Sequence, residues 1–378
     1  MPKPSADKAD RNDTSSVDNP ARFNPQRPVT LRDLADEVGV TAMTVSRVFT
    51  NSSLVAERTR NRVLEAAERL NYRPNRNART LRRGKSDMIG ALYARRAPFA
   101  DSIYGRLLTD LATTSSLNGQ DLVLIPALGG VNHWRYKLTD QRVDGVLVVE
   151  PMPDGLSELL RRNPPPMVLL NLKTDLEVPT VTFDDVESGR LAARHLIDLG
   201  HRRLLYILQS GGSEDHYSRV DRLVGIREVV DARPDVKLEV VRQHEDYMGK
   251  IVDDLAARPR ATRPTGVIVY MDDMALDFHY LATQRGLSIP RDLSVVGFNN
   301  DEFSSRHPIL TSVSLPIDEM AEQSLRLLNE QLELQVEARS RDASDEGPPV
   351  ATMPASPPPL QPTLINRASS GPPPDAKR

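Results

Sequence analysis

The spacing of hydrophobic and polar positions along the chain changes near residue 87. Across residues 28–74, apolar side chains recur at helical spacing in three short segments, and Gly39 separates the first two. Thr30 and Thr41 stand where N-caps would begin these two helices. The pattern predicts three helices with a tight turn between the first two. That unit occurs both in helix-turn-helix DNA-binding proteins and as a plain helical hairpin.

Beyond residue 87, short apolar runs alternate with amphipathic stretches such as Gly189–Leu199 and Met274–Gly286. The runs expected to form buried strands are Met88–Tyr93, Leu122–Pro126, Gly145–Val149, Met167–Leu170, Leu204–Leu208, Gly266–Tyr270 and Leu293–Phe298. Buried strands that alternate with helices are typical of parallel sheets. We therefore expect an α/β core of two doubly wound lobes over residues 87–334. Ligands of such folds bind outside the carboxyl ends of the strands, often between lobes.

The remaining segments show neither the helical spacing of the head nor the alternating apolar runs of the core. They are a polar tail (1–27), a short basic linker (75–86), a charged and then Pro- and Ser-rich segment expected to be a flexible insertion (335–359), a last core segment (360–370) and a tail (371–378). Within the last core segment, Thr363–Ile365 is expected to form a terminal strand.

Charge is unevenly distributed, although the net charge is only −3. Residues 1–86 hold 17 Lys and Arg against 10 Asp and Glu, and from Arg58 to Lys85 the ratio is 10 to 2. A basic head on an acidic body indicates a polyanion as the partner of the head. On charge alone, a solvated basic helix fits equally well.

Several functional classes have no support in the sequence. There is no cysteine, no apolar run of membrane-spanning length and no apolar leader, which favours a cytoplasmic location. No phosphate-binding loop, nucleophile elbow or zinc-protease motif is present, and the seven histidines lack metal-ligand spacing. We expect no enzyme, cofactor or metal site. The acidic pairs are interpreted as a helix cap (Asp184-Asp185), a solvated face (Asp253-Asp254) and a pair with one ligand carboxylate (Asp272-Asp273).

Two stretches of the head resemble the LacI/GalR family of transcriptional regulators. Residues 29–48 read Val-Thr-Leu-Arg-Asp-Leu-Ala-Asp-Glu-Val-Gly-Val-Thr-Ala-Met-Thr-Val-Ser-Arg-Val, and residues 59–75 read Thr-Arg-Asn-Arg-Val-Leu-Glu-Ala-Ala-Glu-Arg-Leu-Asn-Tyr-Arg-Pro-Asn. The resemblance continues to about Ser369. It implies a helix-turn-helix head, a hinge helix and a two-lobed core like that of periplasmic binding proteins. Ala56 stands where the family usually has a capping serine.

The resemblance implies a set of DNA contacts. Ala42, Met43 and Arg47 occupy the exposed part of the recognition helix, and Arg47 suits a bidentate contact to guanine. The expected phosphate contacts are Thr30, Thr44, Ser46, Asn75 and Arg76, which position the protein without specifying sequence. Val45 and Val48 are expected to face the core. Tyr72 suits either a backbone contact or a cover over the small core.

Residues 76–81 resemble the family hinge helix, whose leucine wedges into a central minor-groove step. Leu81 stands at that position, and Arg79, Arg82 and Arg83 flank it. An apolar side chain among arginines suits a wedge that unstacks bases while arginines hold phosphates. Without the resemblance, a basic linker with one incidental leucine fits equally well.

The resemblance also implies effector contacts. The expected cleft residues are Phe99, Asn171, Phe183, Arg222, Tyr247, Asp272 and Asn299. Aromatic faces together with Arg, Asp and Asn suit a polyhydroxylated ligand, so a sugar or sugar derivative is expected. Asn299 falls where the family commonly has Asp, and Met271 where it has Asn.

Taken together, these features predict a repressor that binds a palindromic operator in double-stranded DNA as a homodimer and is controlled by a small-molecule effector. The alternatives are a solute-binding receptor and a sugar-processing enzyme of the same α/β class. The first would lack the head, and the second would carry a nucleophile or an acid/base pair that turns over sugar. No leucine heptads follow the last strand, which disfavours a coiled-coil tetramer.

Overall fold

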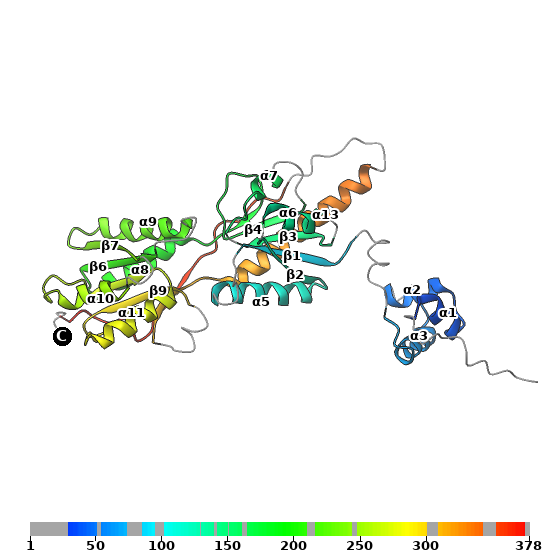
Figure 1. Ribbon diagram of the computed structural model, residues 1–378, viewed down its shortest axis with the longest axis horizontal. Helices are drawn as coiled ribbons and strands as arrows, with labels where there is room; N and C mark the ends of the chain where they lie inside the picture. Colours follow the sequence, from blue (N-terminus) through cyan, green and yellow to red (C-terminus); the bar gives the residue numbers. More distant parts are fainter. Residues whose placement is uncertain are drawn as a thin grey trace, which may run out of the picture. The chain divides into compact units, whose positions relative to one another are not determined.

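The chain divides into two compact units, Met1–Gly84 and Lys85–Arg378, which we describe separately (Figure 1). The computed structural model describes residues 29–50, 54–73, 85–94, 102–128, 130–139, 142–149, 151–160, 165–209, 216–243, 248–300, 309–342 and 353–374. The tail over 1–27, the expected DNA contacts Asn75, Arg76 and Leu81, and the expected cleft residues Phe99 and Tyr247 lie outside these ranges.

The first unit contains the three predicted helices, α1 (Leu31–Val38), α2 (Ala42–Thr50) and α3 (Glu57–Arg69). Thr30 caps α1 in a reciprocal capping box with Asp33, and Gly39 ends the helix with φ at 69°. The Thr41 hydroxyl accepts a hydrogen bond from the Thr44 amide at 3.1 Å and so caps α2. Ala56 precedes α3 without any side-chain cap, as its side chain dictates.

A small apolar core holds these helices together. Its buried residues are Leu34, Ala35, Val38, Val45, Val48, Val63, Ala66 and Ala67. The prediction that Val45 and Val48 face inward is confirmed, because they are 0% and 6% exposed. Tyr72 packs against this core, with its ring centroid 5.7 Å from that of Phe49, so of its two expected roles the structure supports the cover.

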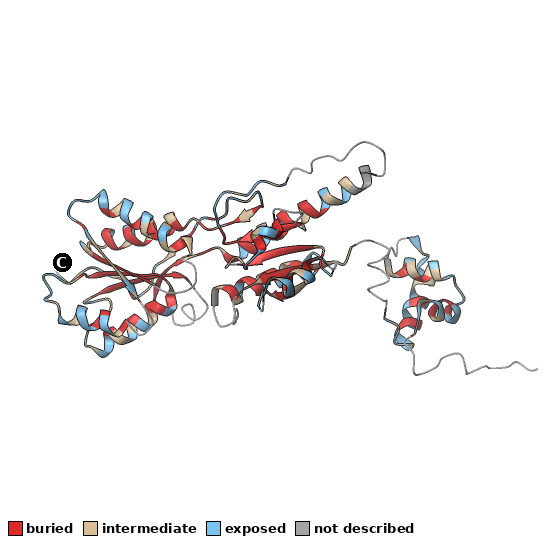
Figure 2. Ribbon diagram, turned by 45° about the horizontal axis from the view of Figure 1, so that its top comes forward, coloured by how far each residue is buried: buried red, intermediate tan, exposed pale blue. Residues whose placement is uncertain are grey.

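The first lobe of the second unit is a five-stranded parallel sheet in the order β2-β1-β3-β4-β5. Its strands are β1 (Met88–Tyr93), β2 (Asp121–Pro126), β3 (Gly145–Val149), β4 (Met167–Leu170) and β5 (Thr180–Val181). Helices α5 (Ser102–Leu117) and α13 (Ile317–Asp342) cover one face. Helices α6 (Val131–Thr139) and α7 (Leu156–Leu160) cover the other. Alternate residues of β3 and β4 contribute to the two cores, because successive side chains point to opposite faces. Figure 2 shows the strands of the sheets largely buried.

The second lobe repeats this plan with one added strand, in the order β11-β10-β9-β8-β6-β7. Its strands are β6 (Arg203–Gln209), β7 (Lys237–Gln243), β8 (Gly266–Val269), β9 (Ser294–Asn299), β10 (Thr311–Ser314) and β11 (Thr363–Ile365). Helices α8 (Asp185–Asp198) and α9 (Tyr217–Asp231) lie on one face, and α10 (Met248–Ala257) and α11 (Asp272–Gln284) on the other (Figure 1). Only β11 pairs antiparallel within the described sheets. The expected pair of doubly wound lobes is confirmed.

The chain crosses between the lobes three times. The first crossing runs from β5 through Phe183 into α8, and the second from β10 through Leu315 into α13. The third runs from Leu360, buried in the first lobe, to β11 in the second. The first and third crossings pair side by side, since the Asp184 amide donates to Leu360 O at 2.9 Å and the Leu360 amide to Thr182 O at 2.8 Å.

One predicted boundary is wrong. Helix α13 continues through Asp342, although residues 335–359 were expected to form a flexible insertion. The segment 335–342 contains no Gly or Pro, and its Gln, Glu, Ala and Arg residues favour helix. Farther along, Ser356 Oγ accepts the Thr180 amide at 2.9 Å, which ties the edge of the first lobe's sheet to this segment. Among the helices that the structure describes, none combines the length and the apolar composition of a membrane-spanning segment.

Candidate functional site

The second helix of the head presents the residues expected to read DNA. Met43 is 64% exposed, Arg47 is exposed, and Ala42 is half-buried, whereas Val45 and Val48 on the opposite side are in the core. No described residue makes a hydrogen bond or ion pair with Arg47. The neighbouring arginines are engaged: Arg62 donates to Val38 O at 2.6 Å, and Arg69 pairs with Glu37 at 2.7 Å. The Arg47 guanidinium therefore lies on the exposed face of α2 without a hydrogen bond or ion pair to any described residue.

The side chains expected to hold phosphates are partly occupied within the head. The Thr30 hydroxyl donates to Asp33 Oδ2 at 2.8 Å and accepts the Asp33 amide at 3.3 Å, so a phosphate would compete with the helix cap. Thr44 Oγ1 lies 2.9 Å from Thr41 Oγ1. Ser46 is half-buried on α2. In this head, Thr30 acts first as a capping residue.

A cavity of about 200 Å³ lies between the two lobes at the carboxyl ends of their strands. This is the place where doubly wound folds bind ligands. Its lining residues come from both lobes: Ile103, Tyr104, Asn171, Phe183, Asp185, His216, Ser218, Arg219, Arg222, Tyr270, Met271, Asp273, Asn299 and Leu315. Most of the lining residues carry a polar group on the side chain, which suits a ligand rich in hydrogen-bonding groups.

Arg222 and Asp185 form a buried ion pair in the lining of this cavity. Arg222 Nε donates to Asp185 Oδ1 at 2.7 Å, and the two side chains are 5% and 1% exposed. Arg222 Nη1 donates to the Tyr270 carbonyl at 2.7 Å. The guanidinium carbon lies 5.0 Å from the Tyr270 ring centre and 4.4 Å from that of Phe298. Burial raises the pKa of Asp185, and the adjacent Arg222 cation opposes that shift.

Two glycines set the distance between the helices that carry this pair. A Cβ built on Gly189 of α8 would lie 2.1 Å from Arg222 O, and one built on Gly225 of α9 would lie 1.9 Å from Val186 O. Real side chains do not approach backbone so closely, so both positions require glycine. The contact brings the start of α8, where Asp185 lies, against the turn of α9 that carries Arg222.

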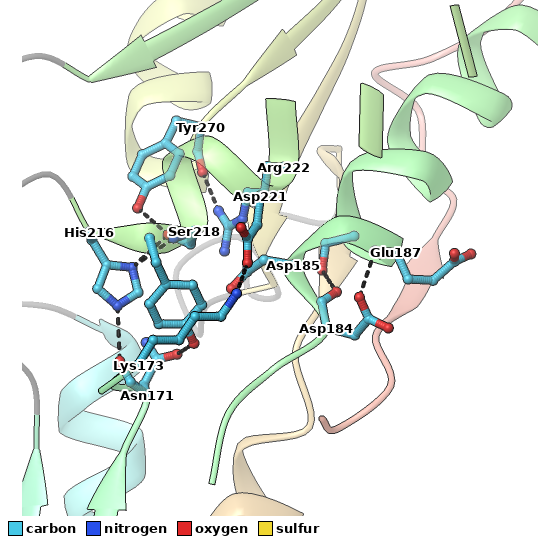
Figure 3. A network of polar contacts seen from close by, with 12 residues as sticks. Asn171, Lys173, Asp184, Asp185, Glu187, His216, Ser218, Asp221, Arg222 and Tyr270 are labelled. Atoms are coloured by element: carbon cyan, nitrogen blue, oxygen red, sulfur yellow. Dashed lines mark hydrogen bonds and ion pairs between the residues drawn. The ribbon is translucent and has the colours of Figure 1, made fainter. Parts of the chain in front are cut away.

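A polar network links the two lobes beside the cavity (Figure 3). Asn171, which follows β4, accepts the Tyr217 hydroxyl on its Oδ1 at 2.7 Å, and its carbonyl lies 3.0 Å from His216 Nε2. His216 caps α9, because its Nδ1 accepts the Ser218 amide. Ser218 Oγ lies 2.7 Å from the Tyr270 hydroxyl. Lys173 of the first lobe also pairs with Asp221 of α9.

Four of the seven predicted effector residues line the cavity, namely Asn171, Phe183, Arg222 and Asn299. Asp272 does not. It is fully buried and accepts the Ser312 hydroxyl at 2.8 and 3.0 Å, and its neighbour Asp273 lines the cavity instead. Asp272 packs against the backbone of Gly297, where a Cβ would lie 2.1 Å from Asp272 Oδ1.

Sequence reasoning missed Tyr270, Ser218 and Asp185 as cavity residues. Asp184-Asp185 was interpreted as a cap, which is confirmed for Asp184, since its Oδ1 accepts the Glu187 amide at 2.8 Å. Asp185 instead turns inward to Arg222. Asp253 and Asp254 lie on a solvated face, as expected. No group of three or more His, Cys, Asp or Glu side chains within the described ranges is arranged to hold a metal ion.

Family models match two parts of the chain. Residues 30–75 match the model described as bacterial regulatory proteins, lacI family, and residues 193–370 match the periplasmic binding protein-like domain. The repressor CytR of Escherichia coli K12 is 30% identical over 322 residues, which cover 80% of this chain and 90% of CytR. The regulator CelR of Thermobifida fusca is also 30% identical, over 80% of this chain and 92% of CelR.

Solved structures give the same picture. A lac repressor dimer bound to operator and the anti-inducer ONPF superposes with a TM-score of 0.71 at 25% identity, covering 91% of this chain and all of that one. A complex of CelR with cellobiose superposes with a TM-score of 0.59 at 27% identity, with the same coverage.

Proposed function

This chain belongs to the LacI family of bacterial regulatory proteins, and we propose that it represses transcription by binding a palindromic operator as a homodimer. It is a DNA-binding transcriptional repressor with an effector-binding domain. The family consists of transcriptional regulators, which sets aside the solute receptor and the sugar-processing enzyme. Since its partner is genomic DNA, we place it in the cytoplasm.

The exposed face of α2 is the observation that carries the DNA-binding proposal. Arg47 is uncommitted and has the geometry for guanine O6 and N7, and Met43 offers an apolar contact to a thymine methyl. Ala42 contributes apolar surface, and Thr44 and Ser46 lie on the same helix within reach of phosphates. Leu81 is proposed as the minor-groove wedge, with Asn75 and Arg76 on the backbone. A two-fold operator would mirror the dimer, as in the operator-bound lac repressor.

A sugar or sugar derivative is proposed as the effector. The polar interlobe cavity supports this, with Asn171, Phe183, Arg222 and Asn299 in its lining. Phe99 and Tyr247 are proposed as further aromatic contacts. Among relatives, CelR has been captured with cellobiose. The effector would act through unequal affinity for the DNA-bound and free arrangements of the lobes, and a 100-fold change in operator affinity requires about 2.7 kcal/mol of coupling.

Genomic footprinting of the full-length protein tests this proposal. We expect protected palindromic sites, and the genes beside them would suggest candidate sugars. On such a site, Arg47→Ala should cost about 1–3 kcal/mol of binding free energy and relax the preference at one base pair per half-site. Arg69→Ala is the matched control, because it removes an arginine engaged by Glu37. Protection that shows no palindrome, or affinity that does not fall with salt, would contradict the proposal.

A further inference from the structure

The Arg222 guanidinium is already paired with a carboxylate of the protein, that of Asp185. Nε donates to Asp185 Oδ1, Nη1 donates to the Tyr270 carbonyl, and the guanidinium carbon lies over the rings of Tyr270 and Phe298. Within the described residues Nη2 has no hydrogen-bond partner, so one donor group of Arg222 remains for a ligand.

A buried arginine in a ligand cavity ordinarily selects a carboxylate or a phosphate, since its guanidinium matches their geometry and charge. Asp185 changes this expectation. The carboxylate and the guanidinium are both almost fully buried, where Coulomb interactions are much stronger than in water. An anionic ligand on Arg222 would place a second negative charge beside Asp185 in that medium.

We propose that Asp185 is a specificity-determining residue, which neutralises Arg222 so that the cleft accepts an uncharged, hydroxyl-bearing effector and rejects a phosphorylated or carboxylated one. This inference deepens the proposed function, on which it rests for the identity of the cavity. It assigns Asp185 to a role that an interpretation as a helix cap had missed.

The rest of the lining has the same neutral character. Asp273 and Arg219 add one charge of each sign, so the carboxylates and guanidiniums of the cavity cancel. Asn171, Ser218, Tyr270 and Asn299 provide neutral donors and acceptors.

The atoms of the ion pair that form no hydrogen bond within the described residues also favour an uncharged ligand. Among the residues that the structure describes, Asp185 Oδ2 is buried and has no hydrogen-bond donor, and Arg222 Nη2 has no acceptor. A hydroxyl group can accept a hydrogen bond from Arg222 Nη2 without adding a charge beside Asp185. An ammonium group would meet the Arg222 cation, and a carboxylate would meet Asp185, so each ion faces one like charge.

Inorganic phosphate is the probe that tests this selection. The full-length protein and its Asp185→Asn variant are titrated with phosphate at constant ionic strength, and hydrogen exchange is followed in peptides that span residues 216–222. We expect no saturable protection in the unmodified protein. Asp185→Asn frees the Arg222 charge and should bind phosphate at least about tenfold more tightly, with protection in these peptides. The double variant Asp185→Asn/Arg222→Gln should lose that gain.

Asp273→Asn is the matched control, because it removes a carboxylate from the same cavity without touching the ion pair. It should raise phosphate affinity by no more than about twofold to threefold. An equal gain in both single variants would overturn the specific role of Asp185, and so would a gain that survives the loss of Arg222. Saturable protection of residues 216–222 by phosphate in the unmodified protein overturns the proposal by itself, even if Asp185→Asn folds poorly. The titration uses no DNA, so failure of the proposed function appears separately, in the footprint.

Discussion

The backbone of Gly225 lies against that of Val186, so close that a Cβ on Gly225 would stand 1.9 Å from the Val186 carbonyl oxygen. Gly189 makes the reciprocal contact with the Arg222 carbonyl. These two contacts hold α8 and α9 at backbone distance. They therefore fix how Asp185 at the start of one helix meets Arg222 on the other.

Gly225→Ala should strongly destabilise the second unit. The added methyl group has only backbone in its way, so α8 and α9 must separate, and we expect a loss of about 3 kcal/mol in the free energy of unfolding. Urea unfolding of the full-length protein, followed by far-UV circular dichroism, measures this loss.

Gly249→Ala on α10 is the control for this substitution. There the new Cβ would meet only the far end of Arg285, at 3.6 Å, so replacing glycine within a helix should stabilise by about 0.5–1 kcal/mol. If both variants shifted the unfolding midpoint alike, close packing at Gly225 would not be the cause.

Substitutions at the helix caps of the head should lower its stability at Thr30 and raise it at Ala56. Thr30→Ala removes both halves of the capping box with Asp33 and should cost about 1 kcal/mol, whereas Ala56→Ser supplies the missing cap of α3 and should add a similar amount. Thermal unfolding of the head within the full chain measures both. A Thr30→Ala protein with unchanged head stability but uniformly weakened DNA binding would instead identify Thr30 as a phosphate contact.

Acid should weaken the second lobe through His201. This residue is fully buried, with Nδ1 2.9 Å from Thr265 Oγ1 and Nε2 2.9 Å from the Gly371 carbonyl. Burial lowers its pKa from 6.5 to about 4. Between these values the unfolded chain binds a proton that the folded chain does not. Stability from this group is therefore complete above pH 6.5 and falls as pH drops towards 4, by about 2 kcal/mol at pH 5.

His201→Gln isolates this contribution, because an amide can keep a donor and an acceptor but does not titrate. Urea unfolding at pH 7 and pH 5 should show a smaller loss of stability on acidification in the variant than in the unmodified protein. Parallel losses would assign the acid sensitivity to other groups, among them His195, whose pKa burial also lowers.

Asp272 and Asp273 should respond differently to replacement by alanine. Loss of the buried Asp272 carboxylate removes the acceptor of the Ser312 hydroxyl proton and leaves a void beside Gly297, so a loss of about 2–4 kcal/mol in the free energy of unfolding is expected. Asp273 is exposed at the cavity, and its replacement should change stability by less than about 1 kcal/mol. Thermal unfolding of the two variants distinguishes them. The reverse order would contradict the structural role assigned to Asp272.

Much of the fold could be predicted because buried strands are continuous apolar runs. Met88–Tyr93, Gly145–Val149 and Met167–Leu170 form strands with the predicted bounds. The missed strands carry weaker patterns. β7 is an edge strand in which the alternation of charged and apolar residues breaks at Val240-Val241. β10 buries serine and threonine through hydrogen bonds that only the fold reveals.

The site was harder to predict, because adjacent residues at the start of a helix make different contacts. Asp184 caps α8 while Asp185 is buried against Arg222, and Asp272 is buried while Asp273 lines the cavity. Sequence spacing cannot separate such neighbours, since a difference of one residue rotates the side chain by about 100° around the helix.

The three interlobe crossings carry a consequence for synthesis of the protein. Helix α13 and Leu360 belong to the core of the first lobe, yet they follow almost the whole second lobe in sequence. A ribosome has thus translated most of the message before the earlier-coded lobe can complete its interior. A premature stop codon near residue 316 would remove β11 from the second lobe. It would also remove from the first lobe the core residues that α13 and Leu360 supply.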